Sequence, residues 1–60
     1  MAYRVNRKGN RLLFVETDSL KSAQQMAKQQ SREGYDMEIR EKRGSRWYLI
    51  GNVGAKQKKR

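Results

Sequence analysis

The chain has 60 residues, so it forms at most one domain, and a domain of this size buries only about 60% of the surface that its unfolded chain exposes. Its 15 Lys and Arg residues outnumber 6 Asp and Glu residues, which gives a formal net charge of +9 at pH 7 and favours a polyanionic partner. Cysteine and histidine are absent, which excludes disulfides, thiolate zinc sites and histidine-based acid–base catalysis, so we expect a non-enzymatic protein without a metal or other cofactor.

The first predicted elements are two strands, residues 3–6 and 11–16, joined by the turn Arg-Lys-Gly-Asn at residues 7–10. Gly and Asn tolerate the positive φ that a tight hairpin turn needs. In the first strand Tyr3 and Val5 alternate with polar residues, which predicts one apolar face. The second strand holds four consecutive apolar residues and is apolar on both faces, which favours a central or covered position in the sheet.

A helix of roughly four turns is predicted after the first two strands, because residues 20–30 are rich in helix formers. The three residues before it, Thr17, Asp18 and Ser19, are all good N-caps. An apolar stripe at helical spacing predicts the side of the helix that packs on the sheet, and it consists of Leu20, Ala23, Met26 and Ala27. Gly34 is well placed for the left-handed C′ position, so the helix should end there, with Tyr35 folding back on its last turn.

Two more strands are predicted after the helix. Residues 35–40 alternate apolar and charged side chains, with Tyr35, Met37 and Ile39 on one side, which is typical of a half-buried strand. The turn Lys-Arg-Gly-Ser at residues 42–45 leads into residues 46–50, a strand that is apolar on both faces like the second one. Gly51 and Gly54 are expected to loosen the chain after it.

The order strand–strand–helix–strand–strand predicts an α+β fold (ββαββ), a four-stranded, mainly antiparallel sheet with one helix packed on one face. Two strand orders, 2-1-3-4 and 1-2-4-3, keep every neighbouring pair antiparallel. We prefer 2-1-3-4, although the apolar second and fourth strands would be central in the other order. We expect residues 1–53 to form the domain and residues 54–60 to form a flexible basic tail.

No targeting or membrane segment is evident in the sequence. The longest apolar runs, residues 12–15 and 47–50, are too short to span a bilayer, and the N-terminus lacks an apolar h-region. We therefore expect a soluble, intracellular, cytoplasmic protein.

A single helix covers only one face of such a sheet, so the apolar side chains of the other face need an explanation. Either Leu12 and Phe14 or Leu13 and Val15 lie on the uncovered face, together with either Trp47 and Leu49 or Tyr48 and Ile50. Three explanations stay open: apolar surface left in water, a homodimer, or a stacking platform for unpaired bases built on Trp47 or Tyr48 among arginines.

The excess of positive charge is concentrated in the two hairpin turns and the tail, where long basic side chains can reach phosphates while the sheet stays rigid. The tail would bind phosphates by counterion release, without sequence preference. The candidate nucleic-acid-binding residues are Arg4, Arg7, Lys8, Arg11, Arg40, Lys42, Arg43, Arg46, Trp47, Tyr48, Lys56, Lys58, Lys59 and Arg60. In either strand order the two turns lie at opposite ends of the sheet.

The sequence favours a small nucleic-acid-binding protein, of DNA or RNA, that uses phosphate contacts from its basic turns and tail. The alternative is a protein-binding inhibitor or adaptor, of the kind a phage or plasmid encodes, that docks its uncovered sheet face or an edge strand on an acidic partner. An apolar, contiguous far face would favour protein binding or dimerisation. An aromatic residue among arginines would favour single-stranded nucleic acid.

Overall fold

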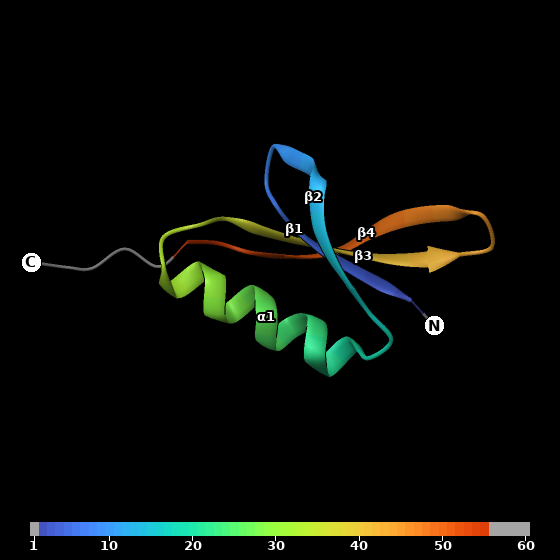
Figure 1. The fold of residues 1–60 in the computed structure, drawn as a ribbon, viewed down its shortest axis with the longest axis horizontal. Coiled ribbons are helices and arrows are strands. Elements are labelled where there is room, and N and C mark those ends of the chain that lie inside the picture. The colour runs from blue at the N-terminus through green and yellow to red at the C-terminus, as the bar shows by residue number, and fades with distance from the viewer. Residues whose placement is uncertain (1, 56–60) are drawn as a thin grey trace, which may run out of the picture.

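The computed structural model describes residues 2–55, which form an antiparallel sheet with one helix on one side (Figure 1). The elements are β1 (Tyr3–Arg7), β2 (Asn10–Thr17), α1 (Leu20–Arg32), β3 (Met37–Arg43) and β4 (Arg46–Val53). The strand order is β2-β1-β3-β4. The α+β class, the ββαββ order and the preferred strand order are thus confirmed, whereas the basic residues 56–60 lie outside the described part of the chain.

Both hairpin turns contain a glycine with positive φ, as the sequence predicts. Gly9 has φ of 85° and Gly44 has φ of 63°, in the left-handed region that side chains with a Cβ rarely adopt. Because Arg7 pairs with Met37 while Tyr3 pairs with Glu41, the two turns lie at opposite ends of the sheet. The β3–β4 hairpin extends past α1 (Figure 1).

The helix begins and ends where its capping residues predict. The hydroxyl of Ser19 accepts a hydrogen bond of 3.3 Å from the backbone N–H of Ser22. At the other end Gly34 has φ of 103°, and the N–H of Tyr35 donates to the carbonyl of Gln30 at 3.3 Å. These bonds satisfy terminal groups that the helix itself leaves open.

All four strands end beyond their predicted last residues, β3 at Arg43 rather than at residue 40. Two of the wrong boundaries have a clear local reason. The third strand begins at Met37 rather than Tyr35, because the backbone N–H of Tyr35 still closes the end of α1. The fourth strand continues to Val53 through Gly51, which was expected to loosen the chain. Ile39 pairs with Gly51 and Arg40 with Leu49, so Ile50 is an extra residue, and this bulge lets the strand continue.

The core lies between α1 and the two central strands. Its buried members are Val5, Ala23, Ala27, Met37 and Ile39, with Tyr3, Met26 and Val53 packed against them. Ala23 and Ala27 have no exposed surface, so the helix backbone lies close to the sheet. Leu20, also predicted in the stripe, stays partly exposed at the start of the helix.

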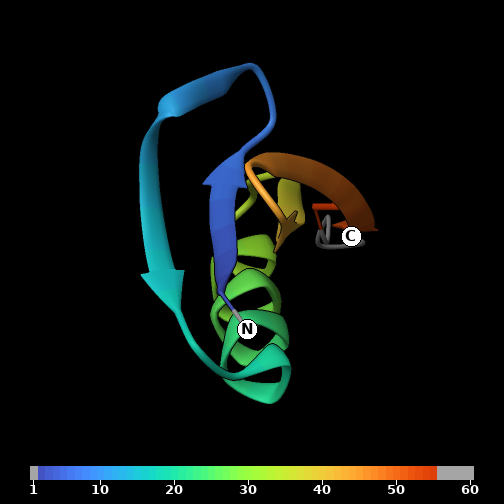
Figure 2. The ribbon, with the colours of Figure 1, turned by 90° about the vertical axis from the view of Figure 1, so that its right-hand side faces the viewer.

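Strand β2 lies at an edge of the sheet and is poorly covered. The helix packs mainly on β1 and β3, and Figure 2 shows β2 standing outside it. Leu12 is 89% exposed, Leu13 71% and Val15 53%. The expectation that the doubly apolar second strand is central or covered was therefore wrong. Strand β4, apolar on both faces as well, forms the other edge, as the preferred strand order predicts.

Candidate nucleic-acid interface

The side of the sheet away from α1, here called the open face, carries both aromatic and basic side chains. Alternation along β1 places Val5 in the core and therefore Arg4 and Asn6 on the open face. Pairing then assigns their neighbours, since cross-strand partners share a face. The open-face pairs are Arg4 with Arg40 and Glu16, Asn6 with Phe14 and Glu38, Arg40 with Leu49, and Lys42 with Trp47.

The guanidinium of Arg4 lies between two aromatic rings from different strands, an arrangement here called the Arg4 stack. Its carbon is 4.0 Å from the ring centroid of Phe14 on β2 and 4.1 Å from that of Trp47 on β4. A planar cation over a ring face is attracted by the ring quadrupole. Arg4 Nε also lies 3.5 Å from a carboxylate oxygen of Glu16, but it is buried and has no hydrogen-bond partner among the described residues. Stacking therefore determines the position of this side chain more than hydrogen bonding does.

A hydrogen-bonded network lies beside the Arg4 stack. Arg40 Nη1 donates to Asn6 Oδ1 and to Glu38 Oε1, both at 2.8 Å, and Asn6 Nδ2 donates to Glu38 Oε1 at 3.1 Å. The bonds from Arg40 and then Asn6 lower the pKa of Glu38 below its ordinary value, against a smaller opposing effect of burial. Glu38 is thus a fixed anion that holds Arg40 in place.

The Arg4 stack and this network line a recess of about 380 Å³ on the open face. Its lining residues are Arg4, Asn6, Arg11, Leu12, Phe14, Arg40 and Trp47. Two aromatic rings, three guanidinium groups and an amide thus meet in one concavity.

Two cations of the open face keep their charge available to a ligand. Among residues 2–55, Arg11 and Lys42 form no ion pair, whereas Arg4, Arg40 and Arg43 each lie within 4.0 Å of a carboxylate. Both are exposed. Arg11 lines the recess, and Lys42 is the cross-strand neighbour of Trp47.

The other predicted residues do not join the recess. Arg7 contacts the ring of Tyr35, 3.7 Å from its centroid, and lies on the helix side. Arg43 and Tyr48 also lie on that side, with the Arg43 carbon 5.5 Å from the Tyr48 centroid. Lys8 and Arg46 lie at opposite hairpin tips. The tail residues Lys56, Lys58, Lys59 and Arg60 lie outside the described residues.

Three residues of the recess were absent from the predicted site. Leu12 and Phe14 were considered for the uncovered face but not for binding, and Asn6 was read only as a polar position in β1. The alternation of β1 already places Arg4 and Asn6 on one face. Which face of β2 and β4 meets them depends on register, which no local pattern specifies.

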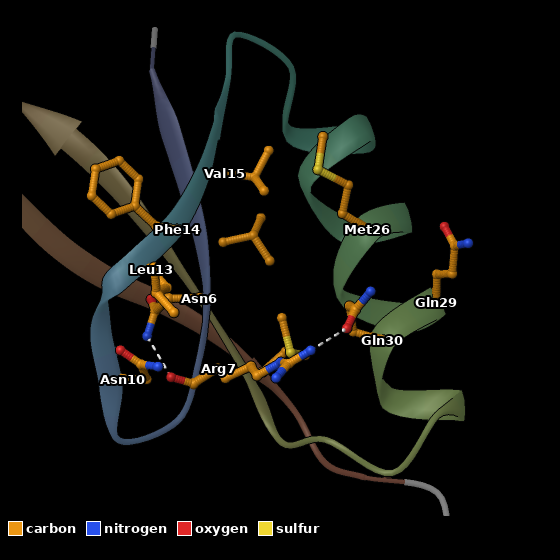
Figure 3. Close-up of a pocket in the computed structure, with 11 residues that line it drawn as sticks. Asn6, Arg7, Asn10, Leu13, Phe14, Val15, Met26, Gln29 and Gln30 are labelled. Atoms are coloured by element: carbon orange, nitrogen blue, oxygen red, sulfur yellow. Dashed lines mark hydrogen bonds between the residues drawn. The ribbon is translucent and has the colours of Figure 1, made fainter.

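A second concavity, here called the β2 groove, lies between β2 and α1 (Figure 3). Its volume is about 420 Å³, and Leu13, Val15, Met26 and Met37 supply most of its apolar wall. Arg7 and Gln30 form a polar end, where Arg7 Nη2 donates to Gln30 Oε1 at 3.4 Å. The groove exists because α1 does not reach over β2.

Neither concavity resembles a metal centre: residues 2–55 hold no group of three or more acidic, cysteine or histidine side chains placed for a metal ion. The one described helix is too short and too polar to cross a membrane. Comparison of the chain with protein-family models, curated proteins and solved structures finds no match.

Proposed function

We propose that the protein binds nucleic acid through the open face of its sheet. The observation that carries this proposal is the recess in which the Arg4 stack meets Arg11 and Arg40, with Lys42 beside it. Lysine and arginine groups without a carboxylate partner bind phosphates by releasing counterions. Because the strands hold the backbone of these residues in place, their binding costs less ordering than binding by a flexible segment.

The polar network supports the same function. Glu38 and Asn6 occupy only Nη1 of Arg40, and a guanidinium carries five N–H donors. The Nε and Nη2 donors of Arg40 bond to no atom within the part of the chain that the structure describes. A ligand that enters the recess therefore meets donors already held in position.

The experiment is a salt titration of binding to fluorescently labelled oligonucleotides, single-stranded and duplex, DNA and RNA. The test variant carries Arg11→Ala and Lys42→Ala, and the matched control carries Lys21→Ala and Lys28→Ala, which remove the same charge from the exposed surface of α1. We expect the test variant to bind about tenfold more weakly and to lower the salt slope by about 1.5, and the control to change the affinity by about twofold at most.

Equal losses in the two variants would show that net charge alone, rather than the open face, controls the affinity. Absence of binding at about 150 mM salt for every oligonucleotide would reject the function itself, since nucleic-acid binding of use in a cell survives that ionic strength.

Protein binding is a second candidate function, favoured by the β2 groove. An edge strand with open backbone groups beside an apolar groove is suited to an added strand from a partner. With a chain of net charge +9, we propose a partner segment that is extended, apolar and flanked by acidic residues. Asn6 and Phe14 line both this groove and the recess, whereas Leu13 and Val15 line the groove alone and Arg11 and Trp47 line the recess alone. The side chains of Val15 and Phe14 lie on opposite sides of β2 in Figure 3, so mutation of the unshared residues separates the two candidates.

A further inference from the structure

We infer that the recess on the open face is a site for unpaired nucleobases, so that the ligand class of the proposed nucleic-acid interface is single-stranded rather than duplex. This inference rests on the proposed function and specifies its substrate. In it, bases stack on Phe14 and Trp47 while the adjoining phosphates contact Arg11 and Lys42.

The first argument is the position of the rings. Phe14 is 39% exposed and Trp47 is half-buried, and both stand on the open face rather than in the core beneath α1. A ring that only stabilised the domain would add to the small core, whereas these two lie against a cation on the opposite side of the sheet. Arg4 holds the rings in place, so little conformational freedom is lost when a base stacks on them.

The second argument is the size and chemistry of the recess. About 380 Å³ is room for a nucleotide-sized group, and the lining combines aromatic faces with guanidinium groups. A duplex keeps its base faces stacked inside and presents only base edges and phosphates, so it gains nothing from the rings. A single strand offers both a base face and a phosphate in every nucleotide.

The third argument is the arrangement of charge around the rings. Arg11 lines the recess together with Phe14, and Lys42 lies opposite Trp47, and neither cation forms an ion pair within residues 2–55. Rings interleaved with cations across neighbouring strands form the surface that a single strand follows, with bases on the rings and phosphates on the cations. The Nε and Nη2 donors of Arg40 are then available to oxygen atoms of a base or phosphate.

Trp47 is the only tryptophan of the chain, so its fluorescence reports directly on the proposed contact. The experiment titrates the full chain with a single-stranded oligonucleotide, an abasic strand of equal length, the corresponding duplex, and heparin. We expect the base-bearing strand to quench the emission by about half and to bind about tenfold more tightly than the abasic strand. The abasic strand and heparin should leave the emission nearly unchanged.

Variants of the protein test the same contact, with binding measured by the fluorescence anisotropy of labelled oligonucleotides. Trp47→Leu should weaken single-strand binding about tenfold and leave heparin binding unchanged, and Trp47→Phe should restore most of the loss. The matched control is Tyr48→Leu, which removes the neighbouring aromatic residue on the helix side of β4 and should have little effect on either ligand. Circular dichroism checks that each variant folds, and the titrations of the unaltered chain do not depend on that result.

Equal affinity for base-bearing and abasic strands, with no change in emission, would overturn the inference while leaving the proposed function intact. Tighter binding to duplex than to single strands would overturn it in the same way. Failure of all four ligands to bind would reject the proposed function as well, so the two failures are distinguishable.

Discussion

At the scale of single residues, Arg4 has the most unusual environment in the described chain. Its guanidinium contacts rings on both edge strands, although its Nε has no hydrogen-bond partner within residues 2–55. A buried N–H without an acceptor costs stability, so the two ring contacts and the nearby Glu16 must offset that cost. The planarity of the guanidinium is what allows one side chain to lie against both rings.

The substitution Arg4→Lys tests whether planarity matters. A compact ammonium cannot stack between two rings, so we expect the free energy of unfolding to fall by about 1 kcal/mol although the charge is kept. The free energy of unfolding is measured by urea titration, with circular dichroism as the signal. The matched control is Arg11→Lys, the same exchange at a side chain without a ring contact, for which a change within about 0.5 kcal/mol is expected. Equal effects would show that the Arg4 stack adds no stability.

Glu38 gives the protein a predictable response to acid. Its pKa is lowered in the folded state, chiefly by the hydrogen bond from Arg40, so its contribution to stability is complete above about pH 4.5, the ordinary value, and declines as the pH falls through the lowered value. The substitution Glu38→Gln should cost about 1 kcal/mol at pH 7 and make the stability less sensitive to pH below 4.5. Urea midpoints at several pH values measure both effects. An unchanged pH profile would mean that the network does not form in solution.

At the scale of elements, the sheet has a well-covered centre and exposed edges. The alanines of α1 bring it close to β1 and β3, and the helix contacts β2 less than either of them. The β2 groove is thus a consequence of one short helix covering four strands. An exposed apolar edge strand promotes aggregation because its open backbone groups can pair with another chain. For the same reason β2 is suited to bind a partner segment.

A pair of substitutions compares how much the exposed edge strand β2 and the buried core contribute to the free energy of unfolding. Leu12→Ser removes a side chain that is 89% exposed and should change the free energy of unfolding by about 0.5 kcal/mol or less. Ile39→Ala removes buried atoms and should cost about 2–5 kcal/mol, enough to unfold a domain this small. Chemical unfolding with sedimentation analysis measures both. A large loss for Leu12→Ser would show that β2 is buried in solution, through association of two chains.

The elements also show how far the sequence predicts the fold. Capping at Ser19 and Gly34 and the glycine turns are local signals, and the structure confirms them. Alternation identified Met37 and Ile39 as buried. It did not reveal that β2 is exposed on both faces, because coverage depends on where the helix lies. The sequence pattern also did not predict the Arg4 stack, because the stack joins residues of three strands and depends on how those strands pair.

At the scale of the whole molecule, the positive charge is distributed along the path from one hairpin tip to the other. Lys8 lies at one tip and Arg46 at the other, and the open face between them carries Arg11 and Lys42. Such an arrangement suits a ligand that runs along the molecule more than one that binds a single spot. In the proposed function the strength of attraction depends on salt, and the position of the ligand depends on the rings.

Removal of the basic tail tests whether the overall affinity for nucleic acid and the preference for base-bearing strands come from different parts of the chain. A chain ending at Ala55 loses Lys56, Lys58, Lys59 and Arg60, which lowers the formal net charge from +9 to +5. We expect its affinity for every nucleic acid to fall, and its salt slope for single strands to decrease by about 0.7 for each phosphate that the tail neutralises in the full chain. Its preference for a base-bearing over an abasic strand should stay within about twofold of that of the full chain, because the proposed stacking contacts are made by Phe14 and Trp47 of the Arg4 stack. Salt titrations of both chains with both strands measure these quantities. If the preference vanished with residues 56–60, selection would reside in the tail, and the open face would serve another purpose.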